Sequence, residues 1–287
     1  MRRYPPLLLV CLLATACIAD PTARATPVPA APSTGALASP APASPSPPAP
    51  SGPRLVSVPT GESAALESPL YAAPRTSARC EMPAIKPDHW GSMKRYLGSA
   101  SACLDRVWTR EFAAVRVFYS PPRRRYVRHH TRDPQCGTMP AKGASGTYCP
   151  LTSTYYILVP RDVIGPWGAA WAAQLTAHEY GHHVQYMTNI LDYADFRSES
   201  ASKRAIDLDS RRLELQAECL SGVALKAARG GLPPLTRFQD LYTGRLPAQW
   251  VRDHGRPSTQ RRWFERGWRS GRPGSCDTWS GPEREVS

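Results

Sequence analysis

The residues with the clearest chemical potential lie in one short stretch, LTAHEYGHHVQ at 175–185. His178 and His182 are four residues apart, so on an α-helix they project from the same face and could bind one metal ion. Glu179 lies beside that face, where its carboxylate could hold a water molecule and take a proton from it. This is the H-E-x-x-H arrangement of zinc hydrolases, in which the metal acidifies a water molecule that attacks a carbonyl.

A second pair of residues spaced by four, Glu214 and Glu218, lies in LELQAECLSGVAL at 213–225. The apolar residues around them indicate a buried helix, where carboxylates are costly unless they are paired or metal-bound. We therefore expect Glu214 to be the third zinc ligand. Glu218 is placed to accept a hydrogen bond from the far nitrogen of a ligand histidine. Competing acids lie in polar stretches that we expect to be exposed: Asp192, Asp195, Glu199, Asp207 and Asp209.

The remaining histidines have other expected roles. A third histidine six residues after His182 is excluded, because that position holds Thr188. His183 is expected to pack or to support a ligand. His254, far along the chain, could either donate to the oxyanion that develops on a substrate or serve a structural role. Three histidines in polar or basic segments are expected at the surface: His89, His129 and His130.

Apolar periodicity predicts the helices that would position these groups. The metal-binding helix is expected from about residue 168 to 191, and the helix with Glu214 from about 203 to 228, before Gly230 and Gly231. One or two further helices are predicted over 88–116.

Short β-branched and aromatic runs predict the strands. Residues 115–119 alternate in the manner of a strand, and 155–159 (YYILV) form a second one before Pro160. The segment 134–150 is read as loop. We expect a strand beside the metal-binding helix, where an extended peptide could add to the sheet edge.

The start of the chain predicts export. A basic start, the apolar run 7–13 and small residues before Cys17 are typical of a signal peptide over 1–16, too short to span a membrane. Cys17 also fits a bacterial lipoprotein box and would then be lipidated. The two alternatives are a lipoprotein on the outer face of the bacterial cell membrane and a freely secreted protein.

Cysteine content agrees with an extracytoplasmic location. Six cysteines remain after Cys11 and Cys17, and an even number in an exported chain indicates three disulfides among 15 possible pairings. Pairing of neighbours would join Cys80 to Cys103, Cys136 to Cys149, and Cys219 to Cys276. A structural zinc site is disfavoured because the sequence contains no C-x-x-C.

Composition divides the chain into a linker and one domain. Residues 17–76 are rich in Pro, Ala and Ser and are expected to form an extended, disordered linker. Residues 77–280 are long enough for a single domain with a sizeable core, and 281–287 form a tail. The formal charge of +13 is spread over scattered arginines with acids among them. With export, this favours a solvated basic surface and makes nucleic acid a poor candidate partner. Nothing in the sequence indicates the oligomeric state.

With these pieces assembled, the domain resembles the bacterial putative neutral zinc metallopeptidase family. The resemblance is carried by HEYGHHVQ at 178–185, CGTM and GTYCP within 136–150, ELQAECLSGV at 214–223 and the segment 254–279. It implies a mainly helical α+β metallopeptidase-like fold with a small antiparallel sheet. It also implies Zn²⁺ bound by His178, His182 and Glu214, with Glu179 as the catalytic base. Glu218 stands where the family usually has aspartate.

The functional expectation is an exported zinc-dependent peptidase that acts on a protein or peptide substrate and contacts the membrane through a lipid anchor. Two alternatives stay open at this stage. One is a surface binding or scaffold lipoprotein that keeps the zinc fold without turnover, although an intact Glu179 speaks for catalysis. The other is an amidase that acts on cell-envelope peptides.

Overall fold

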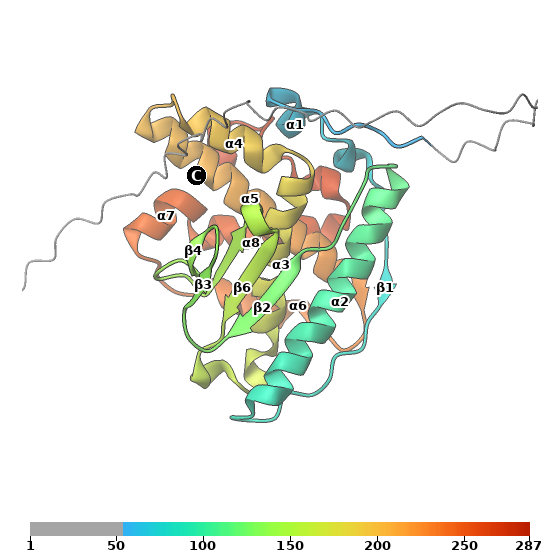
Figure 1. Ribbon diagram of the computed structural model, residues 1–287, viewed down its shortest axis with the longest axis vertical. Helices are drawn as coiled ribbons and strands as arrows, with labels where there is room; N and C mark the ends of the chain where they lie inside the picture. Colours follow the sequence, from blue (N-terminus) through green and yellow to red (C-terminus); the bar gives the residue numbers. More distant parts are fainter. Residues whose placement is uncertain (1–53) are drawn as a thin grey trace, which may run out of the picture. The chain divides into compact units, whose positions relative to one another are not determined.

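The computed structural model describes residues 54–287, whose helices and small sheets form an α+β fold, as expected (Figure 1). The predicted signal peptide, the lipidation site Cys17 and most of the predicted linker lie outside the described residues. Among the described residues, no helix is long and apolar enough to cross a membrane.

Three long helices form the framework of the fold: α2 (Trp90–Ala114), α3 (Ala169–Met187) and α5 (Lys203–Ala227). The helix predicted over 88–116 is therefore one continuous helix. The metal-binding helix ends earlier than expected, because Asn189 adopts a left-handed conformation (φ 58°) and a separate helix α4 (Ile190–Ser198) follows. Ser202 caps α5 by accepting a hydrogen bond from the backbone N–H of Ala205.

Helices α3 and α5 pack against each other at very short range, and this contact builds the site. A Cβ atom added at Gly181 of α3 would lie 2.9 Å from the carbonyl oxygen of Ala217 in α5. Only glycine allows this approach, which sets the histidine face of α3 against the glutamate face of α5. Helix α8 (Pro257–Ser270) covers the other side of α5. The short helices α6 (Leu235–Gln239) and α7 (Ala248–His254) connect the two.

A three-stranded mixed sheet lies beside α3, in the order β2–β6–β5. Its central strand β6 (Thr154–Leu158) confirms the strand predicted at 155–159. β6 runs antiparallel to the edge strand β5 (Gly146–Cys149) and parallel to β2 (Arg123–Val127). The sheet is therefore mixed, whereas a small antiparallel sheet was expected; only the pair of β5 and β6 is antiparallel. The remaining strands form two small pairs: β3 (Thr131–Asp133) with β4 (Gly137–Met139), and β1 (Ala78–Arg79) with β7 (Ala228–Arg229).

Two strand predictions were wrong. Residues 115–119 form no strand, because Arg116 takes a left-handed conformation (φ 57°) and the backbone N–H of Val117 donates to Phe112 at the end of α2. The segment 134–150 is not loop throughout, since β4 and β5 lie within it. Strand β2 was missed because its Arg123–Arg125 run looks like a solvated surface segment; all three arginines are exposed.

The N-terminal boundary of the folded domain lies earlier than expected. Residues 54–76 were predicted to be linker, but they contain α1 (Glu62–Leu66) and a 3₁₀ turn at Pro69–Ala72. Four of their apolar side chains are buried, and Leu70 and Ala73 join the main hydrophobic core; the four are Ala64, Ala65, Leu70 and Ala73. We refer to residues 54–76 as the N-terminal strap.

The predicted tail at 281–287 also packs on the domain. Val286 is buried, and the indole N–H of Trp263 donates to the carbonyl oxygen of Glu285 at 2.9 Å. The three disulfides join Cys80 to Cys103, Cys136 to Cys149, and Cys219 to Cys276, which confirms the pairing of neighbours.

Candidate metal centre

Three side chains from α3 and α5 bring their donor atoms to one point. The Nε2 atoms of His178 and His182 lie 3.1 Å and 3.5 Å from Oε2 of Glu214. All three donor atoms lie within 4.8 Å of one another, which is close enough for one metal ion to bridge them. This is the trio that the spacing of residues predicted.

Each histidine has a hydrogen-bond acceptor at its other ring nitrogen. Nδ1 of His178 lies 3.0 Å from Oε2 of Glu218, and Nδ1 of His182 lies 2.9 Å from Oε1 of Gln185. Carboxylate and amide oxygens can only accept, so both Nδ1 atoms carry the proton. Each Nε2 atom is therefore the one that faces the common point. Nε2 of His178 donates to Oε2 of Glu214, and a metal ion would replace that proton.

Glu218 accepts a hydrogen bond from the far nitrogen of His178, as expected. The residues that hold Glu218 in place were not predicted. Gln174 donates its amide Nε2 to both carboxylate oxygens, at 2.8 and 3.0 Å, and the hydroxyl of Tyr242 donates to Oε1. Tyr242 lies beyond α6, so no local sequence pattern connects it with Glu218. Gln185 was also missed, although its place three residues after His182 on the same helix face is a usable signal.

Glu214 faces histidines on three sides. Besides His178 and His182, Nε2 of His254 lies 3.4 Å from its Oε2. Burial alone would raise the pKa of Glu214, but the facing histidines, with His254 contributing most, hold that pKa well below its usual value. Glu214 is thus ionised, and within residues 54–287 all of its ion-pair partners are histidines.

Glu179 is buried beside the common point. Its side chain is 4% exposed, and its Oε2 atom has no hydrogen-bond partner among the described residues. Burial raises the pKa of this carboxyl. Gly146 of β5 makes room for the side chain, because a Cβ at that position would lie 2.2 Å from Oε1 of Glu179. Strand β5 therefore holds Glu179 against the site.

His254 also lies at the site, at the end of α7. Its ring packs on Trp250, with ring centroids 4.3 Å apart, and its side chain is 26% exposed. The Nδ1 atom has no partner among the described residues. The structure thus brings His254, which is distant in sequence, to the ligand trio beside Glu214.

The other residues considered from the sequence lie outside the ligand trio, although Asp195 lines the same cleft. His183 is buried between Ser120 and Tyr148 and serves packing, and burial lowers its pKa to about 4. Asp209 was expected to be exposed, but it is buried and paired with Arg197 at 2.7 Å. The other competing acids are outside the ligand trio, and so are the exposed His89, His129 and His130.

An open cleft of about 780 Å³ leads to this centre. It is lined by the trio, by Glu179, by β5 and the loop before it, and by residues 246–254. The cleft is large enough for several residues of an extended chain, and it gives a ligand access to the open side of the trio.

A mainly helical α+β domain with two imidazoles, one carboxylate and a buried glutamate at the foot of a cleft defines the zinc-hydrolase class of site. The family model described as "Putative neutral zinc metallopeptidase" matches residues 70–240. The match covers more than half of the chain, and the chain belongs to this family.

Curated relatives are similar over part of their length. The "Uncharacterized protein Rv2575" of Mycobacterium tuberculosis is 32% identical over 195 residues, which cover 54% of this chain and 64% of that protein. The "Uncharacterized protein YpfJ" of Escherichia coli is 29% identical over 202 residues, which cover 62% of this chain and 68% of that protein. The chain thus spans just under two thirds of the mycobacterial relative. No solved structure matched the chain.

Proposed function

We propose that this protein is an exported zinc-dependent peptidase that hydrolyses peptide bonds, with Glu179 as general base. The observation that carries the proposal is the convergence of His178, His182 and Glu214 beside a buried carboxylate whose Oε2 atom has no hydrogen-bond partner within residues 54–287. A structural zinc site would use four protein ligands, whereas three ligands and an open cleft suit catalysis.

The donor set fits Zn²⁺. Two imidazole Nε2 atoms, which offer lone pairs once a metal ion replaces their protons, and one ionised carboxylate are ligands that zinc prefers. An ion held by them would supply Lewis acidity, which polarises a carbonyl and lowers the pKa of a water molecule to about 7.

Glu179 would move the proton. Its carboxylate faces the cleft beside the ligand trio, within reach of a water molecule that approaches a scissile carbonyl. Burial raises its pKa, which is the direction expected for a carboxyl group that takes a proton and later returns it. It would accept the proton from the attacking water and pass it to the leaving amine.

Strand β5 would align the substrate. Leu158 donates its N–H to the carbonyl oxygen of Ser145, so alternate residues of this strand turn toward β6. Gly146 and Tyr148 consequently turn their backbone groups away from β6, toward the cleft that they line. An extended peptide could pair with this free edge, and its backbone would then pass in front of Glu179.

His254 would act on the opposite side of the trio. It lies 3.4 Å from Glu214 and lines the cleft, so a proton on its ring could stabilise negative charge on the substrate oxygen. Of the two roles expected for His254, we therefore propose the catalytic one. Its packing on Trp250 would by itself indicate only a structural role.

Export and membrane anchoring are further parts of the proposal. They are supported by the sequence of the first 17 residues and by three disulfides, which persist in oxidising compartments. A Cys17→Ala variant expressed in a bacterial host tests the anchor. Loss of the protein from the membrane fraction supports lipidation, and an unchanged membrane fraction refutes it.

Two other functions differ in their expected reactivity. A scaffold protein would bind zinc without turnover, and an amidase would cleave envelope peptides but not proteins. The test is cleavage of an unfolded protein by the purified oxidised chain, with and without chelator. We expect chelator-sensitive cleavage, and loss of cleavage with retained zinc in Glu179→Gln. Zinc without cleavage of any amide would favour the scaffold, and equal activity of Glu179→Gln would refute its role.

A further inference from the structure

A chain of buried and partly buried hydrogen bonds leads from His182 across the protein to the N-terminal strap. Nδ1 of His182 contacts Oε1 of Gln185 at 2.9 Å, and Nε2 of Gln185 donates to Oε1 of Gln216 at 2.9 Å. Nε2 of Gln216 donates to the hydroxyl of Tyr71 at 2.8 Å, and that hydroxyl donates to the carbonyl oxygen of Ala65 at 2.8 Å. We call this series the glutamine relay.

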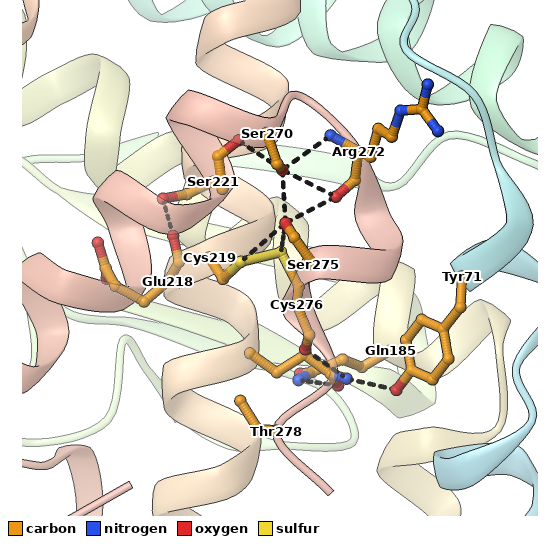
Figure 2. The surroundings of a disulfide bond; sticks show 12 residues. Tyr71, Gln185, Glu218, Cys219, Ser221, Ser270, Arg272, Ser275, Cys276 and Thr278 are labelled. Carbon is orange, nitrogen blue, oxygen red and sulfur yellow. Dashed lines mark hydrogen bonds between the residues drawn. A yellow bond between two sulfur atoms is a disulfide. The ribbon is translucent and has the colours of Figure 1, made fainter. Parts of the chain in front are cut away.

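Backbone carbonyl groups fix the direction of every hydrogen bond in the relay. Carbonyl oxygens only accept, and one lies at each step: Leu213 at 2.8 Å from Nε2 of Gln185, Cys276 at 3.2 Å from Nε2 of Gln216, and Ala65 at the end. Each amide must therefore turn its NH₂ group toward these carbonyls. The oxygen of Gln185 then faces His182, and the oxygen of Gln216 accepts from Nε2 of Gln185. Figure 2 shows Gln185, Tyr71 and the carbonyl of Cys276 converging below the Cys219–Cys276 disulfide.

The relay is buried enough to hold a single arrangement. Gln185 is 0% exposed and Gln216 is 1% exposed, so water does not compete for their amide groups. A buried polar group without its partner costs about 1–3 kcal/mol, which penalises any flipped amide. The two buried glutamines satisfy each other and the neighbouring carbonyl groups, so their amide groups form one polar network.

The geometry points to Gln185, Gln216 and Tyr71 as positioning residues for the metal ligand His182. They hold its Nδ1–H and thereby direct the lone pair of Nε2 toward the metal position, as Glu218 does for His178. This inference rests on the proposed zinc site. It also makes the N-terminal strap and the Cys276 segment, which lie outside the metal helix, part of the support of the metal.

Zinc affinity tests the relay, because outer partners of ligand histidines typically change metal affinity 10–100-fold. We expect Gln185→Met in the full oxidised chain to bind zinc 10–100-fold more weakly in competition with a chromophoric chelator. Tyr71→Phe should weaken binding a few-fold, because Gln216 keeps its contact with Cys276. Gln239→Met is the matched control, since Gln239 bonds to Glu265 away from the site and should leave zinc affinity unchanged.

Gln185→Glu separates positioning from packing. Glutamate keeps an acceptor for the Nδ1–H of His182, but it loses the NH₂ group that donates to Leu213 and Gln216 and brings a charge into a buried position. The zinc affinity of Gln185→Glu should lie within a few-fold of the wild-type affinity, even if the metal-free fold is less stable. A role in packing alone would reverse the ranking and make methionine the better tolerated residue.

The outcomes are distinguishable. Wild-type affinity in Gln185→Met, or methionine outperforming glutamate, would overturn the relay and leave the proposed function intact. If Gln185→Met fails to fold, Tyr71→Phe decides, and unchanged affinity there would overturn the link to the strap. A wild-type chain that binds no zinc would refute the zinc site and the relay together.

Discussion

Gly146→Ala is a small change that should disable the site without removing its metal ligands. The added Cβ would lie 2.2 Å from Oε1 and 2.9 Å from Cγ of Glu179, whereas ordinary contacts begin at 3.4 Å. The carboxylate or strand β5 must therefore move by about 1 Å. Overpacking of this kind costs about 1–3 kcal/mol of stability. A displacement of about 1 Å in a catalytic group can cost about 100-fold in rate.

The assay compares zinc content, unfolding in urea and cleavage of an unfolded protein. We expect Gly146→Ala to keep about one zinc per chain, because no metal ligand is touched, and to lose about 100-fold in kcat. Gly98→Ala is the control, since a Cβ there meets nothing within 4 Å. It should leave activity unchanged and, as a helix substitution, add about 0.5–1 kcal/mol of stability. A folded, zinc-loaded Gly146→Ala with full activity would refute the placement of Glu179.

Two further predictions concern stability. Burial raises the pKa of Glu111 from 4.5 to about 7, so the folded state holds its proton where the unfolded state has lost it. Stability from this group falls as pH rises from 4.5 to 7, by about 3 kcal/mol in all. Glu111→Gln should thus gain up to about 3 kcal/mol over wild type at pH 8 but little at pH 5 in urea unfolding; a constant difference would contradict the shift. Replacing Cys219 and Cys276 by serine opens a loop with a sequence separation of 57 residues and should cost about 4 kcal/mol. It should also weaken zinc binding, since the Cys276 carbonyl belongs to the relay; unchanged zinc affinity would contradict that link.

The ligand trio could be predicted from sequence because its members lie at helical spacing on two well-marked helices. His178 and His182 share one face of α3. Burial of the Glu214 carboxylate would cost free energy unless it were paired or bound to a metal ion. The three disulfides were predicted by pairing cysteines that are neighbours in the sequence, which also uses only local information. None of this required knowledge of the tertiary arrangement.

The supports of the trio could not be predicted, because they arise from distant segments. Gln185 and Gln216 look like ordinary polar residues until α3 and α5 meet at Gly181. The strap was read as linker because Ala64 and Ala65 carry little hydrophobic signal, and their burial depends on the shape of the surface beneath them. The 115–119 run alternates like a strand, but Arg116 turns the chain back onto the end of α2.

The central claim is that His178, His182 and Glu214 bind zinc, and elemental analysis of the purified oxidised chain tests it most directly. The account predicts one zinc per wild-type chain, and far less than one in Glu214→Ala at matched protein concentration with the fold retained. A wild-type chain without zinc, or Glu214→Ala with a full equivalent of zinc, would contradict it.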